Sequence, residues 1–120
     1  ITVPAEISFV KMSSYAGTSS TGTVKQLIGL NNDIKGRTIL IVEDIIESGL
    51  TMKAILAQLA EKQPEAIHIC TLLLKPDCLE TEFDIRYTAF EIPNDFIVGY
   101  GLDYDQQGRN LKDIYTVVEE

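Results

Sequence analysis

Two apolar, β-branched runs separated by a segment of helix length constrain the fold of this chain more than any other feature. Residues 38–42 (Thr-Ile-Leu-Ile-Val) and 66–74 form these runs. Continuous apolar runs of this kind are typical of strands buried on both faces of a parallel sheet. Between them, residues 52–62 carry apolar side chains at helical spacing, and Pro64 follows. The order strand, helix, strand predicts a right-handed parallel crossover and an α/β fold.

The rest of the chain predicts short strands around one long polar segment. Residues 13–22 are small and polar, and we expect a mobile loop there, since long loops in compact domains are usually functional. A hairpin connection without a function is the alternative. A chain of 120 residues has the size of one domain with one core, so we expect residues 1–120 to form a single domain. Further strands are expected at residues 6–12, 24–30, 85–90, 96–100 and 114–118.

Charge and cysteine content exclude several classes of protein. Ten Lys and Arg against eighteen Asp and Glu give a formal net charge of -8, which repels nucleic-acid phosphates and anionic lipids. We therefore expect no nucleic-acid partner and no membrane partner, and the apolar runs are shorter than the roughly 20 residues of a spanning helix. Cys70 and Cys78 lack zinc or redox spacing, which indicates reduced thiols in the cytoplasm. The chain begins without Met, so we expect it to be N-terminally truncated.

Polar side chains follow three predicted strands at their carboxyl ends, where open α/β sheets bind ligands. Glu43 and Asp44 follow the first strand and Lys75 the second, while Asp103 and Arg109 follow the third. The two acids are suited to accept ribose hydroxyls or to hold hydrated Mg2+, and Lys75 to donate to a carbonyl oxygen. Ordinary solvated charge is the alternative for each of them.

Residues 47–51 (Glu-Ser-Gly-Leu-Thr) join the first strand to the helix. A turn around Gly49 with flanking hydroxyl groups can direct successive backbone N–H groups at one anion, so a phosphate fits this segment. The alternative is a helix cap formed by Ser48 or Thr51, with Gly49 easing the turn. The Gly-Lys-Ser or Gly-Lys-Thr of a Walker loop is absent, which disfavours a nucleoside triphosphatase.

The same segment resembles a known signature. Residues 42–51 are similar to the phosphoribosyl pyrophosphate (PRPP) signature of type I phosphoribosyltransferases. Residues 90–104 with Arg109 resemble the purine-binding end of the hypoxanthine-guanine phosphoribosyltransferase family, and Ser14 and Tyr15 resemble its mobile catalytic loop. The resemblance implies the type I phosphoribosyltransferase fold, a mainly parallel sheet flanked by helices. It also implies purine salvage, in which PRPP and a 6-oxopurine base, hypoxanthine or guanine, give IMP or GMP and pyrophosphate.

The resemblance implies roles for the phosphoribosyl half of the site. Glu43 and Asp44 would hold the ribose 2′ and 3′ hydroxyls, and Glu47 would be the catalytic base that takes or shares the purine proton at N7 as N9 attacks. Many relatives carry Asp and Thr where this chain has Glu47 and Ser48, so base strength should survive while positioning shifts. The 5′-phosphate cradle would comprise Glu47, Ser48, Gly49, Leu50 and Thr51.

Roles in the purine half are implied in the same way. Lys75 would donate to the 6-oxygen, Phe96 would stack on the base, and the backbone of Ile97 would read the edge of the ring. Adenine, whose 6-amino donor would face Lys75, should be rejected. Asp103 would lie beside the base and bind Mg2+ on the pyrophosphate, which Arg109 would contact.

The resemblance also implies a cofactor, a loop movement and an assembly. Mg2+ would be bound by Glu43, Asp44 and Asp103. Ser14 and Tyr15 would close over the reacting centre and exclude water. Relatives of this kind form homodimers or homotetramers. Preference among hypoxanthine, guanine and xanthine depends on backbone geometry that residue identities leave open.

Two other functions fit part of the pattern. A receiver-like signalling domain would use Glu43 and Asp44 with Lys75, but it needs a phospho-accepting Asp on an intervening strand that this chain lacks. A non-catalytic nucleotide-binding protein on the phosphoribosyltransferase scaffold is the closer alternative. Nucleotide binding without turnover would distinguish it from an enzyme.

Overall fold

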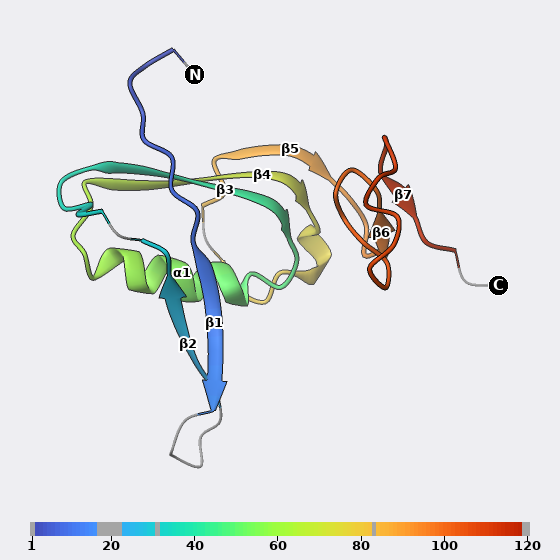
Figure 1. Cartoon of the computed structure of the whole chain (residues 1–120), viewed down its shortest axis with the longest axis horizontal. Helices are drawn as coiled ribbons and strands as arrows, with labels where there is room; N and C mark the ends of the chain where they lie inside the picture. The colour runs from blue at the N-terminus through green and yellow to red at the C-terminus, as the bar shows by residue number, and fades with distance from the viewer. Residues whose placement is uncertain (1, 17–22, 31, 83, 119–120) are drawn as a thin grey trace.

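The computed structural model describes residues 2–16, 23–30, 32–82 and 84–118. Figure 1 shows a central sheet with one helix beneath it, a hairpin beside the helix, and a small strand pair beyond the end of the sheet. The elements in chain order are β1 (Lys11–Ala16), β2 (Thr23–Ile28), β3 (Thr38–Ile46), α1 (Leu50–Ala60), β4 (Ala66–Leu74), the 3-10 turn η1 (Pro76–Cys78), β5 (Tyr87–Glu91), β6 (Ile97–Val98) and β7 (Tyr115–Thr116).

The central sheet is parallel and has the order β3-β4-β5, which confirms the predicted α/β fold. β3 and β4 pair from Thr38 with Ala66 to Ile46 with Leu74, and α1 connects them. The predicted bounds of β4 are confirmed. β3, however, is longer than predicted: Glu43 pairs with Thr71 inside the strand rather than following its end. The ladder continues because β4 offers backbone partners as far as Leu74.

Helix α1 covers one face of the sheet and supports the core on that side. Ile46, Met52, Ile69 and Leu74 form one buried cluster. A second cluster comprises Ile34, Ile55 and Leu59, with Ile39, Ile41 and Ile67 of the sheet packed against it. Both clusters include residues of α1, so the helix joins them.

The opposite face of the sheet is open, which corrects the prediction of strands buried on both faces. Side chains of β3 alternate between half-buried and exposed, and Leu40 and Val42 are 46% and 74% exposed. Tyr87 of β5, in register with Cys70 of β4 and therefore with Val42, is also exposed. The described part of the chain contains a single α-helix and it lies on the other side, so helices flank only one face.

The hairpin of β1 and β2 begins later than predicted. Residues 6–10 are extended and exposed but lie outside any strand, and β1 pairs antiparallel with β2 from Lys11 with Ile28 onward. Pairing with β2 therefore determines where β1 begins, whereas the prediction from apolar residues placed its start too early in the chain. The hairpin is tied to the helix by the Leu27 N–H, which donates to Gln58 Oε1 at 2.8 Å.

Ser14 and Tyr15, predicted in a mobile loop, lie in β1 opposite Lys25 and Val24 of β2. This corrects the bounds of the loop, because ladder pairing extends β1 to Ala16. The remaining loop residues, 17–22, lie outside the described residues. The hairpin extends past α1, on the far side of the helix from the sheet (Figure 1).

The C-terminal part of the chain forms a separate small unit around β6 and β7, which pair antiparallel. It lies beyond the carboxyl ends of the parallel strands (Figure 1). Gly99 and Gly108 allow its loops to pass closely, since a β carbon at Gly99 would stand 2.1 Å from the Asp113 carbonyl oxygen. The strands are shorter than the predicted 96–100 and 114–118 because these turns interrupt the pairing.

None of the helices in the described ranges has the length and apolarity needed to cross a membrane.

Candidate functional site

Two neighbouring cavities lie at the carboxyl end of the parallel sheet, where the sequence predicted a site. The first, of about 170 Å³, lies at the junction of β3 and α1. The second, of about 150 Å³, lies between the ends of β3 and β4 and the β6 region. Ile45 and Glu47 line both. The first is lined by Glu43, Ile45, Ile46, Glu47, Ser48, Gly49, Thr51 and Met52. The second is lined by Ile45, Glu47, Lys75, Phe96, Ile97, Leu102 and Asp103.

The first cavity faces the start of α1. Gly49 is the N-cap residue, with the left-handed φ of 82° that favours glycine. The Ser48 hydroxyl accepts the Leu50 N–H at 3.3 Å, but no side chain makes an N-cap hydrogen bond to this helix, so the alternative of a cap formed by Ser48 or Thr51 is wrong. A helix leaves its first N–H groups without partners of its own, and their partial positive charge attracts anions. The first turn of α1 contains no acidic residue, so the helix start is suited to a phosphate group, while Glu43 and Glu47 line other parts of the cavity.

Glu43 and Asp44 differ in environment because they leave β3 on opposite faces. Glu43 is half-buried and lines the first cavity, whereas Asp44 is exposed. Burial raises the pKa of Glu43 from 4.5 to about 7, and the side-chain hydrogen bond and negative charge of Asp44 act in the same direction. The carboxylate of Glu43 also accepts the Asp44 N–H at 3.3 Å, which lowers the pKa in part. Near neutral pH Glu43 therefore exchanges between its protonated and ionised forms.

Lys75 carries a buried ammonium at the end of β4. The residue is only 4% exposed, and its Nζ donates to Glu47 Oε2 at 2.8 Å. Its backbone N–H donates to the Ile46 carbonyl at 3.0 Å, which ties the end of β4 to the end of β3. The Glu80 N–H donates to the Ser48 carbonyl at 2.9 Å and ties the segment after η1 to the turn before α1. These contacts hold the walls of the two cavities together.

The outer wall of the second cavity comes from the β6 region. Phe96 is exposed, with its ring edge to face against Tyr104. Asp103 Oδ1 is 3.2 Å from Arg109 Nη2, and its Oδ2 accepts the Gln106 N–H at 2.8 Å. An aromatic ring and a lysine ammonium that line one cavity suit a flat ligand that carries a hydrogen-bond acceptor.

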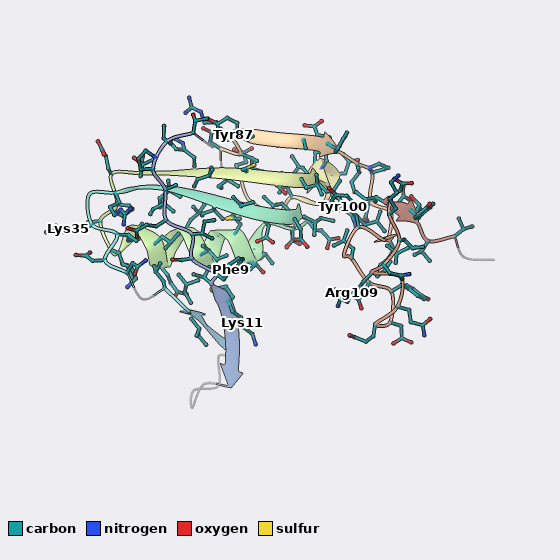
Figure 2. The ribbon with its side chains drawn as sticks, turned by 45° about the horizontal axis from the view of Figure 1, so that its top comes forward. Phe9, Lys11, Lys35, Tyr87, Tyr100 and Arg109 are labelled. Carbon is teal, nitrogen blue, oxygen red and sulfur yellow. The ribbon has the colours of Figure 1, made fainter. Side chains whose placement is uncertain are left out.

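Most of the residues predicted for the phosphoribosyl and purine halves of the site line these cavities, but three of them do not. Neither cavity, over the residues that the structure describes, is lined by Asp44, Leu50 or Arg109. Arg109 donates from Nη1 to the Gly101 carbonyl at 2.9 Å and lies in the β6–β7 unit, to the right of Lys11 of β1 in Figure 2. The linings also contain four apolar residues that sequence reasoning missed. These are Ile45, Ile46, Met52 and Leu102, and only their proximity in sequence to predicted site residues could have indicated them.

The predicted metal ligands do not form a preformed cluster. Glu43 lines the first cavity and Asp103 the second, and Asp44 projects from the other face of β3. Over the ranges that the structure describes, no group of three or more His, Cys, Asp or Glu side chains is placed to hold a metal ion. A metal at this site would take part of its coordination from a ligand.

Comparison with known proteins identifies close relatives of this chain. The family model described as a phosphoribosyl transferase domain matches residues 2–105. A hypoxanthine-guanine phosphoribosyltransferase of Mycobacterium avium is 48% identical over 118 residues, which cover 98% of this chain and 58% of that protein. A hypoxanthine phosphoribosyltransferase of Haemophilus influenzae is 45% identical over 121 residues, covering all of this chain and 68% of that protein. The chain thus spans somewhat more than half the length of its mycobacterial relatives.

Solved structures of hypoxanthine phosphoribosyltransferases are also similar to this chain. A variant of the Trypanosoma cruzi hypoxanthine phosphoribosyltransferase, complexed with the product IMP, has a TM-score of 0.81 and 36% identity, covering 98% of this chain and 59% of that one. A Leishmania tarentolae HGPRT-ase in complex with GMP has a TM-score of 0.70 and 30% identity, covering 75% of this chain and 53% of that one.

Proposed function

Because the chain belongs to the phosphoribosyl transferase domain family, we propose that it provides the nucleotide site of a purine-salvage enzyme. This enzyme transfers 5-phosphoribosyl from PRPP to hypoxanthine or guanine and yields IMP or GMP with pyrophosphate. The observation that supports this most directly is the pair of cavities with a shared wall at Ile45 and Glu47. One cavity suits a phosphate and the other a flat base, which are the two ends of a purine nucleotide.

The phosphate end would occupy the first cavity. The N–H groups at the start of α1, with the hydroxyls of Ser48 and Thr51, are suited to surround the 5′-phosphate. Gly49, with its positive φ, lets the backbone approach the phosphate closely, and Leu50 contributes backbone only. Glu43 and Asp44 would accept hydrogen bonds from the ribose hydroxyls.

The base would occupy the second cavity. Its 6-oxygen would accept a hydrogen bond from the Lys75 ammonium, and its ring would stack on Phe96 while the backbone of Ile97 contacts the ring edge. An ammonium donates three hydrogen bonds and accepts none. A 6-amino purine would therefore present a donor to a donor, which excludes adenine from this cavity.

The donors at the site fit Mg2+, which the resemblance implies. Carboxylate oxygens suit this ion, and it is usually held by one or two carboxylates together with substrate phosphates. Glu43, Asp44 and Asp103 would supply the protein ligands, and the pyrophosphate would supply the rest. Bound Mg2+ would offset negative charge on the leaving group. Arg109 would contact the pyrophosphate when its guanidinium leaves Asp103 and Gly101.

In the proposed reaction the bond from ribose C1 to pyrophosphate breaks and a bond from C1 to purine N9 forms. Glu47 reaches both cavities, and its carboxylate would take or share the proton at N7 as N9 attacks. Ser14 and Tyr15, carried by the hairpin, would close over the reacting carbon and exclude water.

A homodimer or homotetramer is the assembly that we propose for the full-length protein, with residues 1–120 as one domain. The two free thiols, Cys70 and Cys78, support a cytoplasmic location.

Calorimetric titration tests this function, with GMP and IMP as ligands in the presence of Mg2+ and with AMP and inorganic phosphate as controls. We expect GMP or IMP to bind at least tenfold more tightly than AMP. Lys75→Met should reduce that preference, and Thr51→Val should weaken all three nucleotides alike. A folded chain that binds GMP and AMP equally, or neither of them, would contradict the proposed site.

A further inference from the structure

The ion pair between Lys75 and Glu47 joins a buried charge to an exposed one. The side chain of Lys75 is 5% exposed and that of Glu47 is 54% exposed. A buried ammonium is costly unless a carboxylate or other acceptor compensates its charge. The carboxylate remains largely hydrated, so Glu47 loses little solvation in providing this compensation.

Glu47 is the acid that engages Lys75, although a second acid lines the same cavity. Asp103 also borders the second cavity, but its two oxygens are 3.2 Å from Arg109 Nη2 and 2.8 Å from the Gln106 N. Glu47 Oε2 is 2.8 Å from Lys75 Nζ. The direction of the Lys75 side chain therefore depends on Glu47 rather than on Asp103.

We propose that Glu47 is a positioning residue that sets the base preference of the site by holding the Lys75 side chain so that its remaining N–H donors face the second cavity. The proposal rests on the proposed function and adds to it a role that is separate from proton transfer. Glu47 engages the ammonium through Oε2, which leaves Oε1 for a ligand. The ammonium keeps two further N–H donors for the 6-oxygen of a purine.

Removal of the charge of Glu47 should relax the preference. In Glu47→Gln the buried ammonium loses the carboxylate that fixes its direction. Its N–H donors are then no longer held toward the base, so they favour a 6-oxygen less and oppose the 6-amino group of adenine less. We expect the ratio of GMP to AMP affinity to fall about tenfold or more. Glu47→Asp keeps the charge and should hold the ratio within about threefold of the unchanged protein.

A double-mutant cycle separates this role from a general effect on folding. In Lys75→Met the flexible apolar side chain fills the buried space without a charge, so Glu47 has nothing to hold. If Glu47 acts through Lys75, the double variant has the same ratio of GMP to AMP affinity as Lys75→Met alone. In the unchanged chain, by contrast, Glu47→Gln alters this ratio. Glu65→Gln removes one exposed negative charge elsewhere and serves as the matched control.

Calorimetric titration of the unchanged chain and these variants with GMP and AMP measures the ratio of the two affinities. Thermal melts show that each variant is folded. A fall of the ratio in Glu47→Gln, its rescue in Glu47→Asp and no further change in the Lys75→Met background support the proposal. If the unchanged chain prefers GMP and Glu47→Gln keeps that preference within twofold, the proposal is overturned while the proposed function stands. If the unchanged chain has no preference for GMP, both fall together.

Discussion

The ring of Phe96 meets the ring of Tyr104 edge to face, with centroids 5.6 Å apart and ring planes at 84°. Phe96 lines the second cavity and Tyr104 does not. The tyrosine therefore stands behind the ring on which we propose that a base stacks. Edge-to-face pairs of this geometry contribute about 0.5–1.5 kcal/mol beyond area burial.

Removal of this support should weaken nucleotide binding. Tyr104→Ala is expected to reduce GMP affinity about 3- to 10-fold, because Phe96 loses the contact that orients its ring. Tyr104→Phe keeps the ring and should retain the affinity. Calorimetric titration with GMP checks both variants. Equal affinity in Tyr104→Ala and the unchanged chain would show that Phe96 needs no such support.

Close packing at Gly99 should make this position intolerant of any side chain. Its φ is +100°, and a β carbon there would meet the Asp113 carbonyl oxygen at 2.1 Å. Gly99→Ala should therefore lower the free energy of unfolding by more than about 2 kcal/mol. Gly36 also has a positive φ, +73°, but has open space around it, so Gly36→Ala should cost only about 1 kcal/mol. Urea denaturation measures both, and equal losses would contradict the steric explanation.

The raised pKa of Glu43 should make stability depend on pH. Burial, together with Asp44, raises this pKa to about 7 from 4.5, so between these values the folded chain keeps a proton that the unfolded chain releases. Stability contributed by this group is therefore present below pH 4.5, falls as the pH rises toward 7, and is lost above that. For one proton, the free energy of unfolding changes by at most about 1.4 kcal/mol per pH unit.

Glu43→Gln removes this titration and should flatten the fall in urea midpoint between pH 4.5 and 7. Asp44→Asn removes the neighbouring negative charge and should reduce the slope only in part, because burial is the larger cause. Glu65→Gln, at an exposed position, controls for the loss of a carboxyl group. An unchanged slope in Glu43→Gln would show that other groups produce the pH dependence.

The hydrogen bond between Leu27 and Gln58 should control how firmly the hairpin is attached to the helix. The Leu27 N–H donates to Gln58 Oε1 at 2.8 Å. Gln58→Ala removes the acceptor, so hydrogen exchange at the Leu27 amide should accelerate about tenfold, which corresponds to about 1.4 kcal/mol. Gln58→Glu keeps an acceptor oxygen and should keep the amide protected. Mass spectrometry or NMR of the exchange distinguishes these outcomes.

Local sequence was sufficient to predict the central elements and the position of the turn before α1. β4 has the predicted bounds because its apolar run coincides with its ladder pairs, and the turn at Gly49 lies where its residue types indicated. Strand ends that depend on partners were predicted less well. β1 begins at Lys11 because β2 pairs with it from there, and the exposed Ile7 and Phe9 gave no sign of this.

The contacts around the second cavity could not be read from the sequence. Lys75 and Glu47 are 28 residues apart, and their pairing follows from the parallel register that brings Leu74 beside Ile46. Arg109 was predicted to contact a ligand, yet its guanidinium engages Asp103 and the Gly101 carbonyl. Such pairings depend on the relative positions of elements, which residue types alone leave open.

The shared wall of the two cavities limits how the site can be re-engineered. Ile45 lines both the first and the second cavity, so a change of this side chain alters both. A larger residue at Ile45 would narrow the second cavity and the first together. Substitutions at Ile45 therefore have to be chosen for their effect on both cavities, whereas residues that line one cavity alone, such as Thr51 and Phe96, can be varied separately.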